Sequence, residues 1–189
     1  MEIVLATSNP GKAREVRTIL KSEGFKVVTL PIWLGEVETG TTYLENARLK
    51  AFSTLRTVRR PVLAEDTGLE IDALRGLPGI RSARFAGPAA RSADNVAKVL
   101  RLLDGVPEGD RTARYKIVAV LALPSGGEVV GEGALEGRIV QKPKGSAGFG
   151  YDPIFVPEGE DRTVAEMRAD EKNVLSHRTK ALRDLLEKL

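Results

Sequence analysis

The sequence has no cysteine among its 189 residues, which excludes disulfide bonds and any metal site built on thiolates. It has no apolar stretch of the length that a membrane-spanning helix requires, so no membrane partner is expected. No basic segment followed by an apolar one precedes the first apolar run, so no secretion signal is predicted. Internal repeats and low-complexity linkers are also missing. These absences favour a cytoplasmic protein.

Charge of one sign is not in large excess either. The chain carries 29 Lys and Arg residues against 26 Asp and Glu residues, for a net charge of +3. Proteins that bind nucleic acid through its phosphates usually show a strong basic patch. This balance indicates none, so we expect no nucleic-acid partner. A chain of this length forms one sizeable core, or two lobes that share one, which predicts a single domain over residues 1–189.

Helical and strand patterns alternate along the chain. Apolar residues at helical spacing predict helices over residues 10–23, 42–58, 91–103 and after Ser176. Short apolar runs predict strands over residues 3–6, 25–30 and 61–64, with a further strand or turn at 69–74. Residues 115–123 and 128–140 are typical of a hairpin. Interleaved elements predict the α/β class, and the hairpin makes the predicted sheet mixed.

The N-terminal stretch is typical of an anion site. A polar loop, residues 7–9, follows the first apolar run, and Pro10 opens a helix for which Asn9 is a suitable cap. Free backbone N–H groups and the helix dipole favour an anion there. Lys12 lies in the first turn, where a cation is unfavourable for the dipole unless an anion binds nearby. The alternative is a lysine that points into water, and this stretch alone favours neither.

Acids and cations suited to nucleotide phosphates occur along the chain. Carboxylates suit Mg²⁺ and can orient or deprotonate water, whereas Lys and Arg suit phosphate. Glu65 and Asp66 are predicted to follow a strand, where ligand sites of α/β sheets gather. Asn46 and Lys50 lie four apart and can face one ligand, although a solvated helix face is the preferred interpretation. Further candidates are Glu38, Asp152, Lys12, Lys172, Arg178 and the only histidine, His177.

Six motifs occur in a fixed order from residue 7 to residue 178. They are Thr7-Ser-Asn-Pro-Gly-Lys12, Glu38-Thr-Gly with Glu45-Asn-Ala-Arg-Leu-Lys50, Glu65-Asp-Thr-Gly-Leu69, Pro78-Gly-Ile-Arg-Ser-Ala-Arg84, Gly148-Phe-Gly-Tyr-Asp-Pro153 and Ser176-His-Arg178. Each motif alone is weakly specific. Together they cover essentially the whole chain and resemble the inosine/xanthosine triphosphate pyrophosphatase family.

The resemblance implies an activity and an architecture. The activity is hydrolysis of dITP, ITP and XTP to the monophosphate and pyrophosphate, with Mg²⁺. The architecture is a homodimer of two-lobed α/β subunits, each with a central twisted mixed sheet flanked by helices and an active-site cleft between the lobes. Glu38 and Asp66 match the family's metal-binding acids, and Asp66 also matches the proton acceptor for the attacking water.

The resemblance also implies a set of substrate-binding residues. The proposed triphosphate loop is Thr7, Ser8, Asn9, Pro10, Gly11 and Lys12. Lys50, Thr67 and Lys172 match phosphate-side or substrate contacts. The base-recognition set is Phe149, Gly150, Tyr151, Asp152, His177 and Arg178. Glu65 stands where many relatives carry Asp, which leaves open whether its longer side chain reaches the metal.

Hydrogen bonding can explain in this hypothesis how the protein distinguishes 6-oxo purines from adenine. The 6-oxo group of hypoxanthine and xanthine is an acceptor, whereas adenine presents an amino donor there. Arg178 has donors only, so it can pair with the oxo group and not with adenine. Two other functions remain open, namely a nucleotide- or RNA-binding module without catalysis and a pyrophosphatase for modified pyrimidine nucleotides. Neither the rejection of GTP nor the dimer interface follows from the sequence.

Overall fold

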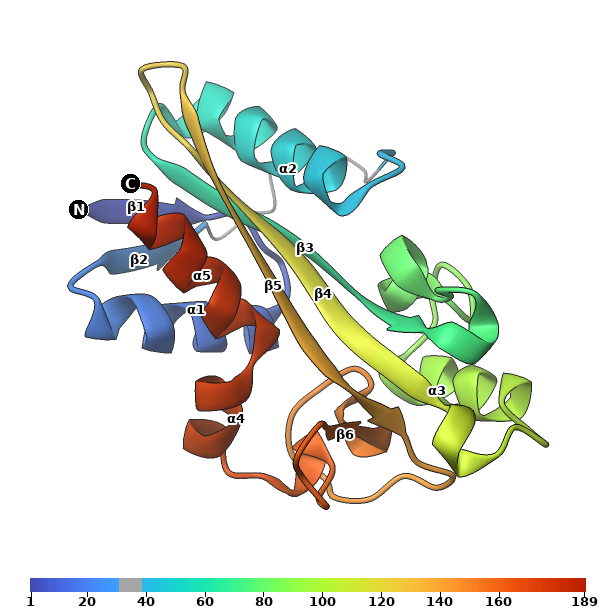
Figure 1. The fold of residues 1–189 in the computed structure, drawn as a ribbon. Coiled ribbons are helices and arrows are strands. Elements are labelled where there is room, and N and C mark those ends of the chain that lie inside the picture. Colours follow the sequence, from blue (N-terminus) through green and yellow to red (C-terminus); the bar gives the residue numbers. More distant parts are fainter. Residues whose placement is uncertain (31–38) are drawn as a thin grey trace. The chain divides into compact units, whose positions relative to one another are not determined.

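The computed structural model describes residues 1–30 and 39–189 (Figure 1). Its α-helices are α1 (Pro10–Ser22), α2 (Tyr43–Val58), α3 (Ser92–Leu102), α4 (Ala169–Leu175) and α5 (His177–Glu187). Its strands are β1 (Glu2–Leu5), β2 (Lys26–Thr29), β3 (Val62–Ile71), β4 (Thr112–Ala122), β5 (Glu128–Ile139) and β6 (Phe155–Pro157). None of the helices described is long and apolar enough to cross a membrane.

The strands form a mixed six-stranded sheet. Their order is β2-β1-β3-β4-β5-β6. β1 pairs in parallel with β2 and β3, whereas β5 and β6 are antiparallel. Neighbouring β4 and β5 are joined by a tight turn in which the Leu123 N–H donates to the Gly127 carbonyl at 2.9 Å. The predicted α/β class, the mixed sheet and the hairpin are therefore confirmed.

The chain divides into two compact units, as the two-lobed prediction requires. Unit 1 comprises Met1–Asp66, Ile117–Gly133 and His177–Leu189. Unit 2 comprises Thr67–Lys116 and Ala134–Ser176. Strands β3, β4 and β5 each contribute residues to both units.

In unit 1, helices cover both faces of the sheet. Successive strand residues point to opposite faces, and the two sides of β1 accordingly enter different cores. Ile3 and Leu5 pack with apolar residues of α1 and α5, whereas Val4 and Ala6 pack with those of α2. Figure 1 shows α1 and α5 on one side of β1 and α2 on the other. This layering holds the starts of α1 and α5 on the same side of the sheet.

Unit 2 has a core of its own around α3. Val96 and Val99 of this helix are buried, as their helical spacing predicts, and pack with Leu69 and Ile71 of β3. Phe155 of β6 joins the same cluster. The strand β6 was not predicted, because it carries no clear periodic pattern. The capping-box pattern Thr163-Val-Ala-Glu166 predicts a short helix, and the structure has a 3₁₀ turn at Val164–Glu166 followed by α4.

Strand β3 differs from its prediction. The sequence predicts a strand over 61–64 that ends at two acids, with a separate strand or turn at 69–74. In the structure one strand runs from Val62 to Ile71. Glu65 and Asp66 are only 3% and 4% exposed and are strand residues themselves. Both carboxylates pair with buried cations, described below. The strand can therefore continue through two buried acids.

Two glycines let α5 lie directly on β5. A Cβ atom on Gly133 would stand 2.2 Å from the His177 carbonyl oxygen and 2.7 Å from the Ala181 nitrogen. Both are backbone atoms of the helix, so side-chain rotation cannot relieve the clash. A Cβ on Gly131 would meet the Ala181 carbonyl oxygen at 2.1 Å. The close approach of the start of α5 to β5 thus depends on the absence of side chains at Gly131 and Gly133.

The Gly133→Ala variant should lose about 1–3 kcal/mol of unfolding free energy, the usual cost of overpacking. Urea denaturation measures this loss. Gly127→Ala is the matched control, since a Cβ there meets nothing within 4 Å; its unfolding free energy should change by less than about 0.5 kcal/mol. Equal stability of the two variants would contradict close packing of α5 on β5.

Candidate functional site

The loop before α1 is shaped by its own side chains. Asn9 Oδ1 accepts hydrogen bonds from the N–H groups of Gly11 at 2.8 Å and Lys12 at 3.2 Å. Thr7 Oγ1 accepts one from the Asn9 N–H at 3.2 Å. The first turn of α1 contains no acidic residue, so the positive end of its dipole is not compensated there. The predicted strand, loop and capped helix are confirmed.

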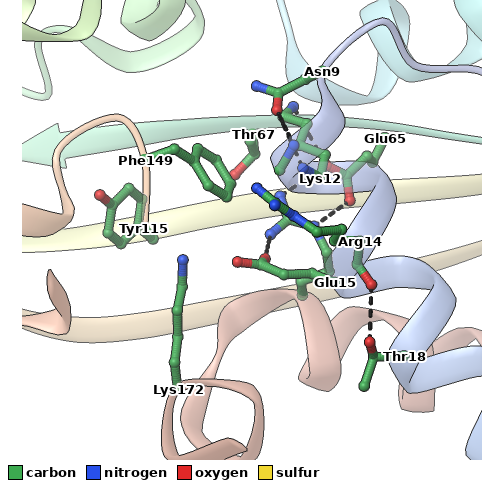
Figure 2. Close-up of polar contacts among 12 residues, drawn as sticks. Asn9, Lys12, Arg14, Glu15, Thr18, Glu65, Thr67, Tyr115, Phe149 and Lys172 are labelled. Atoms are coloured by element: carbon green, nitrogen blue, oxygen red, sulfur yellow. Dashed lines mark hydrogen bonds and ion pairs between the residues drawn. The ribbon is translucent and has the colours of Figure 1, made fainter. Parts of the chain in front are cut away.

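Lys12 does not point into water. Its side chain is 16% exposed, and its Nζ lies 3.3 Å from Oε1 of Glu65 (Figure 2). Burial lowers the pKa of Lys12, Glu65 opposes this effect, and the nearby cations Lys50 and Arg178 lower the pKa further. A lysine held among other cations is well placed for an additional anion.

Arg178, at the start of α5, lies between two carboxylates of unit 1. Its Nε and Nη2 donate to the two oxygens of Glu65 at 2.7 and 2.8 Å. Its Nη1 donates to Oε2 of Glu15 on α1. Burial alone would raise the pKa of Glu65, but Arg178 and Lys12 hold that pKa at about 2. Glu65 therefore already has both oxygens engaged by a cation.

Asp66 is held by α2. Asn46 Nδ2 donates to Oδ2 of Asp66 at 3.1 Å, and Lys50 Nζ lies 3.6 Å from Oδ1. Asn46 Oδ1 accepts the Gly40 N–H at 2.8 Å, so both ends of the amide are used. Asn46 and Lys50 are buried, and the preferred sequence interpretation of a solvated face was wrong. Their burial is explained by Asp66, which supplies the acceptor and the countercharge.

The described part of the chain offers one carboxylate, Asp66, to a hard divalent cation that takes its other ligands from substrate phosphates. Glu38, the other predicted metal ligand, lies outside the described residues. Within residues 1–30 and 39–189, no group of three or more acidic or histidine side chains gathers into a preformed metal site. Mg²⁺ is usually held by one or two carboxylates together with substrate phosphates. The buried carboxylate of Asp66 suits that pattern.

Unit 2 carries a second cluster around the buried Asp152. Its Oδ2 accepts from the Phe149 N–H at 2.9 Å and from Lys172 Nζ at 2.7 Å. Its Oδ1 accepts from the Tyr115 hydroxyl at 3.3 Å. Lys172 Nζ also lies 4.5 Å from the centroid of the Phe149 ring, a cation–π distance. A cation, a carboxylate and an aromatic face are thus brought together in unit 2. Tyr115 was not predicted.

Comparison with known proteins gives the family. Residues 3–188 match the Ham1 family. The chain belongs to the Ham1 family. A dITP/XTP pyrophosphatase of Geobacillus kaustophilus is 46% identical over 98% of this chain and 93% of the relative. One of Bacillus subtilis is 43% identical over 97% of this chain and 94% of the relative. The resemblance stated from the sequence motifs is confirmed.

Solved Ham1 structures share the fold. The HAM1 protein from Coxiella burnetii is 37% identical, with a TM-score of 0.87 over 100% of both chains. The dITP/XTP pyrophosphatase from Mycobacterium abscessus is 40% identical, with a TM-score of 0.78 over 100% of this chain and 99% of that one.

Other predicted site residues of this Ham1 protein have mainly backbone partners. The Tyr151 side chain is buried, its hydroxyl donates to the Ser82 carbonyl at 2.8 Å, and burial raises the pKa of Tyr151. Thr67 Oγ1 donates to the Lys116 carbonyl at 2.8 Å. Gly150 has a positive φ of 65° in the turn between Phe149 and Tyr151. His177 is buried at the first position of α5. The functional roles of these residues stay predictions.

Sequence reasoning missed Glu15, whose partner Arg178 is 163 residues away. One local signal was present, since Glu15 follows Lys12 by three residues and therefore shares its face of α1. The figure shows both side chains extending from the same side of this helix (Figure 2). In this Ham1 chain, that face carries a cation and an anion of the same buried cluster.

Proposed function

We propose that this protein hydrolyses non-standard purine nucleoside triphosphates, namely dITP, ITP and XTP, to the nucleoside monophosphate and pyrophosphate. The names of its Ham1 relatives support this substrate class. The observation that carries the proposal is the arrangement within unit 1. A half-buried lysine, Lys12, stands in the first turn of a capped helix, and a buried carboxylate, Asp66, is held by Asn46 and Lys50.

In the proposed reaction, water attacks the α-phosphorus in line with the bond to the β-phosphate oxygen. A new P–O bond forms, the α–β anhydride bond breaks, and pyrophosphate leaves. Asp66 accepts the proton of the attacking water. Lys12 and the N-terminus of α1 stabilise the negative charge that grows on the leaving group. Bound Mg²⁺ supplies neutralisation of the phosphate charges, and Asp66 with Glu38 would hold it.

The purine is proposed to bind through Phe149, Gly150, Tyr151, Asp152, Lys172, His177 and Arg178. Phe149 supplies a stacking face. Lys172 donates only, so it favours a 6-oxo group over the amino group of adenine. Arg178 already donates to Glu65 and Glu15, so a base oxygen would use its remaining N–H groups. The remaining phosphate contacts are assigned to the loop 7–12, Lys50 and Thr67, and the active form is proposed to be a homodimer.

Pyrophosphate release from a nucleotide panel tests the proposal. The panel is ITP, dITP, XTP, GTP, ATP and a modified pyrimidine triphosphate, each with Mg²⁺ and with EDTA. We expect Mg²⁺-dependent release from ITP, dITP and XTP, with kcat/KM at least about 100-fold above that for ATP. Binding of ITP without release would favour a binding module. Preferred turnover of the modified pyrimidine would favour the other class of pyrophosphatase.

A further inference from the structure

We propose that Glu15 is a positioning residue that, through Arg178 and Glu65, controls how freely Lys12 binds a triphosphate. The inference rests on the proposed function, because it assigns Lys12 to the phosphate chain. It concerns a residue that belongs to none of the predicted metal, phosphate or base sets. Its evidence is a ring that three ion pairs among four charged side chains form with helix α1, which carries both end members.

The ring starts and ends on α1. Lys12 pairs with Glu65 at 3.3 Å, Glu65 pairs with Arg178 at 2.7 Å, and Arg178 pairs with Glu15. The exposed fractions of the side chains are 16% for Lys12, 12% for Glu15, 2% for Glu65 and 1% for Arg178. Two cations and two anions thus neutralise each other with little help from solvent. Such a cluster is sensitive to the loss of one member.

The two cations of the ring are held to Glu65 with unequal strength. Arg178 makes two parallel hydrogen bonds to Glu65, a geometry that is stronger and more directional than a single contact. Lys12 makes one longer contact and is the most exposed member. When a triphosphate arrives, Lys12 can therefore transfer to it while Arg178 continues to neutralise Glu65. Lys12 is the exchangeable cation, and Arg178 is the fixed one.

Glu15 keeps Arg178 fixed. Without Glu15, the Nη1 group of Arg178 is buried without this acceptor, which costs free energy. Arg178 then shifts to recover a partner, and its paired hydrogen bonds to Glu65 loosen. Glu65 consequently draws Lys12 more strongly, and Lys12 becomes less available to phosphate. Asp66 has its own partners on α2, so the chemical step is not directly affected.

Steady-state kinetics with ITP and Mg²⁺ test the role. We expect Glu15→Ala to raise KM about tenfold, which is the effect of one lost hydrogen bond to a charged group, and to leave kcat within about twofold. Glu15→Gln retains an acceptor for Nη1, and its KM should stay within about threefold of wild type. Glu23→Ala is the matched control, because it removes an exposed carboxylate next to the other end of α1; its kinetics should not change.

A double-mutant cycle separates positioning from a general structural role. Lys12→Ala should raise KM, and adding Glu15→Ala to it should raise KM by much less than the tenfold seen in the wild-type background, because Glu15 acts mainly through Lys12. Additive losses, an unchanged KM in Glu15→Ala, or a Glu15→Gln variant as impaired as Glu15→Ala would each overturn the proposal. If Glu15→Ala does not fold by circular dichroism, Glu15→Asp replaces it, since the shorter side chain withdraws the acceptor and keeps the charge.

Calorimetric titration of ITP in EDTA keeps the two proposals distinguishable. The dissociation constant for Glu15→Ala should rise by the same factor as KM. If wild type releases no pyrophosphate from the panel, the proposed function fails, and the titration still tests the ring. If wild type hydrolyses ITP while neither KM nor the dissociation constant responds to Glu15→Ala, the function stands and the role of Glu15 fails.

Discussion

The Asp66→Asn variant is expected to hydrolyse ITP about 10³-fold more slowly than wild type, within the range for loss of a general base. The amide has nearly the same shape and can still accept the hydrogen bond from Asn46. It cannot take up a proton from water, and it is a poor ligand for Mg²⁺. The loss should therefore appear mainly in kcat, measured as pyrophosphate release under saturating ITP.

Two measurements make this result interpretable. Thermal unfolding should show that Asp66→Asn is folded under the assay conditions. Asp104→Asn is the control, since it removes an exposed carboxylate in unit 2, and its turnover should equal that of wild type. If Asp66→Asn retained turnover within about tenfold of wild type, that loss would be too small for a general base. Asp66 would then not be the proton acceptor.

The Arg178→Ala variant is expected to lose about 3–5 kcal/mol of unfolding free energy, the usual effect of removing one partner of a buried ion pair. The change leaves Glu65 with Lys12 alone and removes the guanidinium from Glu15. Urea denaturation at pH 7 measures the loss. Arg183→Ala, an exposed position on the same helix α5, should change stability by less than about 0.5 kcal/mol.

The pH dependence of this loss identifies its cause. In wild type the pKa of Glu65 is held at about 2, well below its ordinary value of 4.5. The stability that comes from this depressed pKa is present above about pH 4.5 and is lost as the pH falls towards 2. Arg178→Ala lacks most of it, so the difference between variant and wild type should narrow over that range. A difference that is constant with pH would point to lost packing instead of lost charge pairing.

Local signals predicted the parts of the fold that depend on neighbouring residues. Asn9 before Pro10 correctly placed the start of α1, and Thr42 correctly placed that of α2, because capping is decided within one turn of helix. The sequence Thr42-Tyr-Leu-Glu45 has the pattern of a capping box, and this box is only half formed in the structure: Thr42 accepts from the Glu45 N–H, while the Glu45 carboxylate accepts from Thr41. Short α4 has no buried residue, so it left no apolar pattern to detect.

The contacts that could not be predicted join residues that are distant in sequence. The spacing of Asn46 and Lys50 is typical of a solvated helix face, and only their contacts with Asp66 explain why they are buried. The ion pair of Glu65 with Arg178 spans 113 residues, and no local pattern of charges specifies it. The sequence motifs nevertheless contain most members of the clusters around Glu65, Asp66 and Asp152. The residue types needed for nucleotide chemistry can be recognised in a sequence, whereas the contacts between those residues cannot.

The wide sequence separation within the four-residue ring has a consequence for synthesis of the protein. Lys12, Glu15 and Glu65 leave the ribosome long before Arg178, which follows Glu15 by 163 residues. Until α5 has been made and docks on β5, Glu15 and Glu65 lack Arg178, and Lys12 is the partner of Glu65 that is already present. The loop before α1 therefore acquires its final electrostatics late in translation. We expect a nascent chain to be a poor competitor for cellular nucleotides until that helix is in place.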